Sequence, residues 1–444
     1  MSIPDVVSLE LGGLFGESLL ADMGEVLRLY EFYDGRGQDW QVAEDLDYAP
    51  SKLITNLGKK LIKREARFMF GRTPEIRVIN SQTGEVIPKL QAVLDKVLEN
   101  SSFADRLLKG ARDCFIGKRV ALKVSGSMGG EISVSVKPSL EFIYETYDDD
   151  SDRLRKIIFF YQTVDSPRRA EQRIWKQKFE MGGGRCYMSE GIYDGAGNLL
   201  EGGETHNTGL SFIPCRVIIN DGLTGDMLGE SDIKEIMSSQ TAYNRLKSDD
   251  LDALRFNMFP QRVAVDASGE SLENMCIAPG ALVDLVTEPA RDGDNVQASL
   301  SVLESKFGYD SRFEHTLNRI KEDMHELLGV PNLSLEQLQG LAQSGKSMKA
   351  LYWELIERSE ERWAVWEPAI RWMARAIIEM ARVYGDEELP NGDYMIHVEH
   401  LYPIMEDEEN ERELDLKEVA AGVRTTESYA QKWGITAVSQ SGTV

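Results

Sequence analysis

Two long helical segments flank a short strand-rich segment, and this arrangement constrains the fold of the 444-residue chain more than any other feature. Helical periodicity predicts one helix over 231–257 and another over 301–328. Between them, β-branched and alternating residues predict short strands at 261–265, 281–286 and 296–298. We therefore expect the two helices to carry a small β unit away from the rest of the chain.

The first of these helices, with Ser231 as its expected N-cap, has an inner stripe that is apolar at both ends and polar in the middle. The stripe consists of Ile233, Ile236, Gln240, Asn244, Lys247, Leu251 and Leu254. Because its middle is polar, the helix is unsuited to an ordinary hydrophobic core and suits packing against other helices with solvated gaps. In the second helix, apolar residues recur at spacings of four and three and form a seam of coiled-coil type: Phe313, Leu317, Ile320, Met324 and Leu327.

A third long helix is expected over 346–384, with a kink caused by Pro368. The segment 329–331, Gly-Val-Pro, ends the preceding helix. The residues between these helices, 332–344, contain a single ionised side chain, that of Glu336. Four tryptophans of the third helix are expected in the core: Trp353, Trp363, Trp366 and Trp372.

The first 230 residues predict a mixed, largely antiparallel β region with helices. Helices are expected over 14–33, 50–70 and about 90–115, and strands over 75–79, 119–124, 131–136 and 156–163. Glycine clusters at 126–130, 182–184 and 195–203 predict hairpin turns. After Gly385 the chain becomes acidic, with a strand expected over 394–398 and two short helices over 405–421 and 426–432.

The helix expected over 50–70 carries the densest basic patch of the chain. Its members are Lys59, Lys60, Lys63, Arg64 and Arg67. Two interpretations remain open: the patch is a solvated face or a subunit contact, or it is a surface for an acidic neighbour.

The chain has 50 Lys and Arg residues against 74 Asp and Glu residues, a net charge of −24. This balance argues against a protein that holds nucleic acid on a broad basic face, but it allows one that lets nucleic acid pass. The sequence contains no run of 18 apolar residues, so no membrane span is expected. The first residues lack a basic region and an apolar region, so secretion is not expected. The four cysteines form no CxxC pair and are expected to be free thiols, and no metal site is expected at His397 and His400.

The segment Gly340–Ser347 fits the P-loop pattern GxxxxGK[ST] and precedes a helix. In a P-loop, Lys346 would contact the β- and γ-phosphates and Ser347 would contact magnesium. The context differs, because a P-loop follows a buried strand, whereas 333–339 has charge and amide groups where apolar residues belong. A nucleotide-dependent enzyme is therefore the disfavoured alternative.

A series of short segments stands in an informative order along the chain. They are Tyr30–Gly35, Asn56–Gly71, Ala242–Asp252, Leu328–Pro331, Ser344–Ala350 and Val419–Glu427. In this order they resemble the portal proteins of tailed bacteriophages of the siphophage type, the SPP1-like family, over nearly the whole chain. One departure is Ser347, which stands where the family often has alanine.

The resemblance implies an α+β portal fold assembled as a ring, usually of twelve subunits, at one vertex of the capsid. Its implied parts are an α/β wing (1–230), stem helix 1 (231–257), a small β-rich clip (258–300), stem helix 2 (301–329), a tunnel loop (330–345), a wing return with the long bent helix (346–403) and a helical crown (404–444).

The implied function is a structural channel through which double-stranded DNA is packaged and ejected, without catalysis or cofactor. The DNA-facing residues expected in the tunnel loop are Leu333, Leu335, Glu336, Gln337, Leu338, Gln339, Leu341 and Gln343. Those expected along the stem are Gln240, Asn244, Lys247, Arg319 and Lys321.

The implied partners are further copies of the chain, non-specifically passing DNA, the terminase, the major capsid and scaffolding proteins, and the head-completion (adaptor) protein, with no membrane. The implied location is the portal vertex of the virion, after assembly in the host cytoplasm. A third reading, besides the P-loop enzyme, is another phage capsid or scaffold protein that shares the α/β body but forms no ring.

Overall fold

The computed structural model describes residues 13–40, 48–127, 129, 131–164, 166–258, 261–265, 299–303, 308, 310–332, 349–385, 388–390, 392–403, 408–423, 425 and 428–429. The chain divides into two compact units. The first comprises Met1–Gly37, Asn56–Met237 and His325–Val444, and the second comprises Gln38–Thr55 and Ser238–Met324. The stretch Gln38–Thr55, which we expected in the wing, thus belongs with the residues of the long helices.

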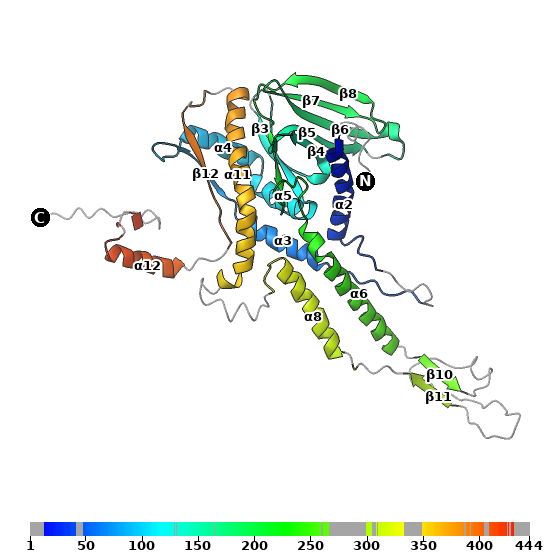
Figure 1. Cartoon of the computed structure of the whole chain (residues 1–444). Helices are drawn as coiled ribbons and strands as arrows, with labels where there is room; N and C mark the ends of the chain where they lie inside the picture. The colour runs from blue at the N-terminus through cyan, green and yellow to red at the C-terminus, as the bar shows by residue number, and fades with distance from the viewer. Residues whose placement is uncertain are drawn as a thin grey trace, which may run out of the picture. The chain divides into compact units, whose positions relative to one another are not determined.

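Three antiparallel sheets form the framework of the first unit (Figure 1). The largest has the order β4-β5-β6-β7-β8, with strands Phe142–Tyr147, Asp150–Val164, Arg173–Gly182, Arg185–Tyr193 and Leu199–Asn207. The second has the order β3-β2-β9, with strands Ile132–Pro138, Arg119–Gly126 and Cys215–Ile219. The third pairs β1 (Glu75–Asn80) with β12 (Tyr394–Glu399), so that residues more than 300 positions apart are hydrogen-bonded.

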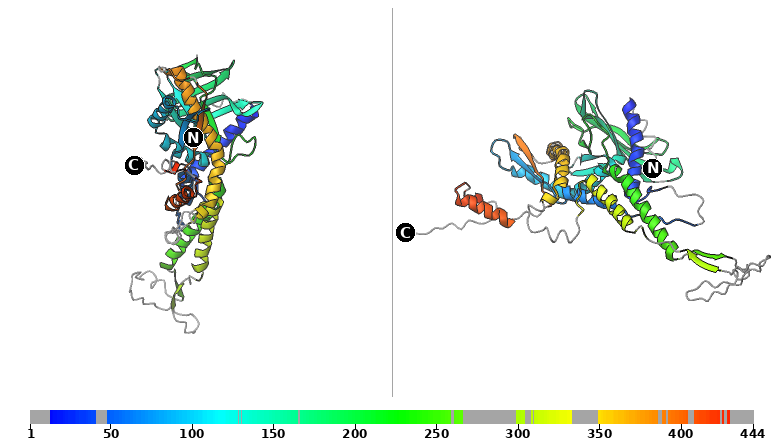
Figure 2. Two further views of the ribbon diagram at one scale, coloured as in Figure 1. Left: turned by 90° about the vertical axis from the view of Figure 1, so that its left-hand side faces the viewer. Right: turned by 60° about the horizontal axis from the view of Figure 1, so that its bottom comes forward.

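Helices cover the three-stranded sheet, whose central strand β2 is buried along most of its length. Among the described residues, the helices that lie wholly in this unit include α2 (Gly13–Tyr33), α3 (Leu57–Phe70), α4 (Pro88–Asn100), α5 (Phe103–Gly117), α11 (Trp353–Tyr384) and α12 (Glu408–Ala420). Both α5 and α11 pack on the sheet, and Figure 2 shows α11 from two further sides. Glycine permits the closest approach: a Cβ at Gly110 of α5 would lie 2.5 Å from Val136, and one at Gly126 of β2 would lie 2.8 Å from Met380 and Tyr384.

Two long helices connect the units along the sequence. Helix α6 (Asp232–Met258) is followed by β10 (Gln261–Val265), and β11 (Ser299–Leu303) is followed by α8 (Asp310–Leu327). Strands β10 and β11 pair antiparallel, with Gln261 opposite Leu303. At the end of α8, Gly329 has a φ of +60°, and the backbone N–H groups of Gly329 and Val330 bond back to α8 carbonyls. The predicted stop at 329–331 is therefore confirmed.

Most predicted elements of the first unit are confirmed, including the mixed helix and sheet class. Several boundaries were wrong. The helix expected over 346–384 is interrupted by a turn at Tyr352, and α11 begins at Trp353. The expected helix over 50–70 begins only at Leu57, because the side chain of Asn56 caps it by accepting from the Lys59 N–H. The expected helix over 90–115 is two helices separated at Ser102, whose φ is +48°. The second long helix begins at Asp310 rather than Ser301, because the alternating Ser299–Leu303 forms β11 instead.

The tryptophans of α11 are only partly in the core: Trp366 is buried, whereas Trp353 is 58% exposed. Helix α11 continues through Pro368, and the kink there stays a prediction. The strands expected at 281–286 and 296–298 lie outside the described residues.

Candidate functional site

An irregular stretch of chain, residues 48–55, runs along α6 within the second unit; we call it the strap. Alternate backbone N–H groups of the strap donate to side chains of α6. Ser51 donates to Asp252 Oδ2 at 2.9 Å, Leu53 to Ser248 Oγ at 2.9 Å, and Thr55 to Asn244 Oδ1 at 3.0 Å. Gln240 Nε2 completes the series by donating to the Thr55 carbonyl at 2.8 Å.

The strap and the helix match because their repeats are similar. Every second residue of an extended chain advances about 6.6–6.8 Å, and every fourth residue of a helix advances about 6.0 Å. The strap runs antiparallel to α6, so acceptors spaced four residues apart meet donors spaced two residues apart. The four polar side chains, which we call the ladder, are Gln240, Asn244, Ser248 and Asp252, and all of them are buried.

The ladder corrects our expectation for the stem. Gln240 and Asn244 have no exposed surface, and their polar groups are satisfied by the strap and, for Asn244, also by Gln38. They therefore do not face a solvated channel, and the polar stripe is satisfied within one chain. The stripe also continues through Ser248 and Asp252 rather than Lys247, Leu251 and Leu254. Strict spacing of four between polar residues was the signal that we missed.

A buried ionic cluster within the first unit includes the first turn of α6. Asp232 of α6 and Glu65 of α3 share two guanidinium groups from α11. Arg358 lies 2.8 Å from Glu65 and 3.1 Å from Asp232, whereas Arg362 lies 2.8 Å from Asp232 and also contacts Glu65. Two carboxylates thus face two guanidiniums, and the cluster joins three helices that are far apart in the sequence.

Further contacts stabilise the charges of this cluster. The Arg362 guanidinium stacks 4.0 Å from the ring centroid of Phe115, and Asn220 donates to Asp232 at 3.1 Å. Burial raises the pKa of the Glu65 carboxyl, and the attraction of Arg362 opposes that rise. Burial also works against the charge of Arg358, but Glu65 and its neighbouring carboxylates raise the pKa of Arg358 above its usual value. The position of Asp232 in the first turn of a helix is favourable for a negative charge.

The remaining predicted site residues are placed as follows. Lys247 is half-buried on α6, with its Nζ 5.4 Å from the ring centroid of Tyr243. On α8, Arg319 is exposed and Lys321 is half-buried. The eight tunnel-loop residues and the P-loop match all lie outside the described residues.

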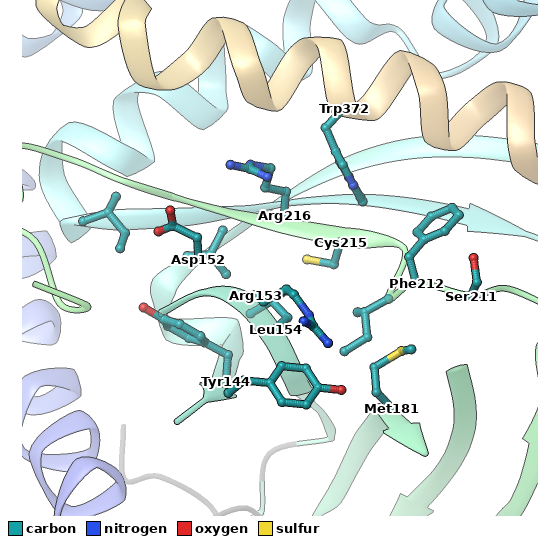
Figure 3. Close-up of a pocket in the computed structure, with 14 residues that line it drawn as sticks. Tyr144, Asp152, Arg153, Leu154, Met181, Ser211, Phe212, Cys215, Arg216 and Trp372 are labelled. Atoms are coloured by element: carbon teal, nitrogen blue, oxygen red, sulfur yellow. The ribbon is translucent and has the colours of Figure 1, made fainter. Parts of the chain in front are cut away.

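A cavity of about 340 Å³ lies in the first unit between the two larger sheets and α11. Figure 3 shows Arg216 and Trp372 on one side of it and Tyr144 and Met181 on the other. Burial raises the pKa of the Cys215 thiol in its wall, which keeps the sulfur protonated and poorly nucleophilic. The lining therefore does not suggest catalysis.

Within the part of the chain that the structure describes, no group of three or more His, Cys, Asp or Glu residues is arranged to hold a metal ion. Among the same residues, none of the helices has the length and apolar character needed to cross a membrane. Cys114, Cys186 and Cys215 are buried free thiols, as predicted.

Comparison with known proteins identifies the family. The family model described as "Phage portal protein, SPP1 Gp6-like" matches residues 18–439, and the chain belongs to this family. Its function is accordingly that of a portal, the connector of a phage particle, and the family is one of structural proteins. The comparison gives no support to the P-loop alternative.

Solved structures are similar to this chain at low identity. A chain in "Virion of native gene transfer agent (GTA) particle" is 12% identical with a TM-score of 0.48, and the match covers 93% of each chain. A chain in "Neck of empty GTA particle computed with C6 symmetry" is 12% identical with a TM-score of 0.47, over 86% of this chain and 90% of that one. No curated protein matches the sequence.

Proposed function

We propose that the chain assembles into a closed ring of about twelve subunits at one capsid vertex, and that double-stranded DNA enters and leaves through the central channel. The observation that carries this proposal is the family match over 18–439, which spans both long helices and everything between them. The protein acts as a conduit in this account and needs no cofactor.

The apolar seam of α8 supports assembly. Phe313, Leu317 and Ile320 are only half-buried in the single chain, although they recur on one side of the helix. An apolar stripe that one chain covers incompletely suits a neighbouring helix from another subunit. The seam therefore supplies the kind of contact that a ring of parallel subunits requires.

The charge of α8 suits a channel that does not hold DNA. Five acidic residues, Asp310, Glu314, Glu322, Asp323 and Glu326, accompany three basic ones, Arg312, Arg319 and Lys321. Because each phosphate–cation contact adds affinity, an excess of acid keeps the duplex mobile. We place Lys247, Arg319 and Lys321 along the channel and the loop 330–345 at its narrowest point.

The parts of the portal have separate roles in this proposal. The clip, 258–300, docks the terminase during packaging and later the head-completion protein, and the rest of the ring meets the capsid and scaffolding proteins. The wing and crown keep the sequence boundaries given above, except that residues 38–55 group with the long helices. Stem helix 2 begins at Asp310. Assembly takes place in the host cytoplasm, and the ring then remains in the virion.

Native mass spectrometry of the purified chain tests the proposal. We expect one closed high-order oligomer, and a monomer at every salt concentration would contradict it. ATP hydrolysis tests the enzyme alternative in the same preparation. We expect no turnover, and turnover that Lys346→Ala abolishes would favour the P-loop enzyme instead.

A further inference from the structure

A basic stripe covers the outer side of α3. Lys60, Lys63, Arg64 and Arg67 recur at the spacing of one helical face. Lys60, Arg64 and Arg67 are exposed and Lys63 is half-buried, whereas Leu61, Ile62 and Glu65 are buried. Glu65 contacts α11, so the stripe faces away from that helix. We call these four residues the basic face.

An acidic groove of about 730 Å³ lies where the end of α8 meets the start of α11. Its carboxylates come from Glu326, Glu354, Glu357, Glu360 and Glu361. All five of these residues are exposed, and the groove also holds two exposed apolar side chains, Trp353 at 58% and Leu327 at 47%. Among the residues that the structure describes, the groove thus presents both charge and apolar surface to a partner, and Glu360 also accepts a hydrogen bond from the Tyr402 hydroxyl.

The composition of the groove is unfavourable in an isolated chain. Glu354, Glu357 and Glu361 lie three, four and seven residues apart on α11, where like charges repel. Among the described residues that line the groove, the one guanidinium is that of Arg358, which Glu65 and Asp232 already engage. An exposed tryptophan beside such a cluster is typical of a site that a partner covers. A basic segment that docks in the groove would relieve the repulsion between the carboxylates and would cover the exposed tryptophan.

We propose that the basic face of α3 on one subunit docks into the acidic groove of the next subunit around the ring. The inference rests on the proposed function, because a cyclic ring needs two different complementary surfaces on each subunit. The basic face and the acidic groove are such a pair, opposite in charge and carried by the same chain. An acidic groove also repels DNA, so its occupant is a second copy of this chain.

The contact assigns a role to the basic patch that the sequence left open. It joins α3 of one subunit to α11 of the next. Within each subunit, Glu65 of α3 is paired with Arg358 and Arg362 of α11. Both surfaces therefore rest on the same buried cluster, repeated around the ring. A rigid base of this kind lowers the entropic cost of docking.

A charge swap tests the contact. Lys63→Glu with Arg64→Glu reverses the basic face, and Glu357→Lys with Glu361→Lys reverses the groove. Each double variant should raise the protein concentration needed for ring formation at least about tenfold, since like charges then face each other. The four substitutions together should restore assembly to within about threefold of the wild type, and high salt should weaken the wild-type ring.

A matched control changes the same amount of charge elsewhere. Lys89→Glu with Lys96→Glu alters two exposed lysines of α4 and should leave assembly unchanged. A second readout does not depend on affinity: Arg64→Cys combined with Glu357→Cys should yield disulfide-linked oligomers upon oxidation, and either single substitution should not.

Four results would overturn the contact. Rings that form normally in both double variants contradict the contact. A fourfold variant that stays defective while its monomer remains folded contradicts it too. Neither result contradicts the proposal that the wild type forms a ring. Loss of DNA binding with normal rings in the basic-face variant assigns that face to DNA instead. Absence of rings in the wild type overturns the proposed function, and this contact with it.

Discussion

The side chain of Asn244 accepts a hydrogen bond from the backbone N–H of Thr55 at 3.0 Å, joining residues 189 positions apart. The same amide donates to Gln38 at 2.6 Å, so both ends of the Asn244 side chain are used inside the chain. The polar middle of α6 therefore binds the strap, a segment near the N-terminus of the same chain. This relationship explains how a long helix can bury a polar stripe.

Asn244→Leu should release the strap. The variant leaves the Thr55 N–H without its buried acceptor, and we expect a loss of about 1–3 kcal/mol in the free energy of unfolding. Trypsin should then cleave after the exposed Lys52 faster than in the wild type. Arg245→Gln, on the exposed side of α6, serves as the control. Equal cleavage rates in the two variants would show that the ladder does not hold the strap.

Arg362→Met should be among the most destabilising substitutions in the first unit. It leaves the buried Asp232 and Glu65 with one guanidinium between them, and breaking a buried pair in this way costs about 3–5 kcal/mol. Arg371→Met removes an exposed pair with Glu367 and should cost less than about 1 kcal/mol. Denaturant unfolding of both variants measures the difference, and similar losses would contradict the role of the cluster.

Lys123 should make stability depend on pH. Its ammonium is buried among Phe159, Trp175 and Phe179, and burial lowers the pKa of Lys123 to about 8. In the unfolded chain the pKa of Lys123 is near 10.5. Between about pH 8 and pH 10.5, Lys123 is therefore mostly protonated in the unfolded chain and mostly neutral in the folded one. Stability should therefore rise with pH from about 8 to about 10.5, because folding favours the neutral amine.

The Lys123→Met variant isolates this effect from other titrations. Wild type should gain on the order of 1–3 kcal/mol relative to the variant across that interval. Thermal unfolding at matched pH values measures the difference. A constant difference between the two proteins would show that Lys123 titrates at its ordinary pKa.

Arginine in the tunnel loop should slow the passage of DNA through the channel. Gln337→Arg or Gln339→Arg adds one cation per subunit to a segment with a single charge, Glu336. If this loop meets the duplex, packaging should slow or stall, and the defect should ease as salt rises, because added phosphate contacts depend on salt. Ring formation should be unaffected. Normal packaging by both variants at low salt would show that the loop does not meet DNA.

Local sequence patterns predicted the long helices of the first unit and its strands β1, β2, β3, β5 and β12, but they did not predict β4, β6, β7, β8 or β9 individually. Alternation in Glu75–Ile79 and in Tyr394–Val398 predicted both strands, and the structure confirms them as β1 and β12. Their pairing was not predictable, because no local pattern links segments so far apart in the sequence. The same limit hid the cluster around Arg362, because the members of the cluster come from three separate helices.

Two of the errors have a common physical origin in tertiary hydrogen bonds. Helical propensity extends back to Pro50, but the backbone of Ser51, Leu53 and Thr55 finds better partners on α6. Likewise, Ser299–Leu303 pairs with Gln261–Val265 instead of extending α8. In both places a long-range partner decided between local alternatives of similar energy.

Electron microscopy of the purified protein tests the central claim most directly. End-on class averages should show closed rings of about twelve subunits around a central hole, with side views showing a single ring. Compact particles without a hole, at every protein concentration and salt condition, would contradict the account that this chain forms a DNA channel.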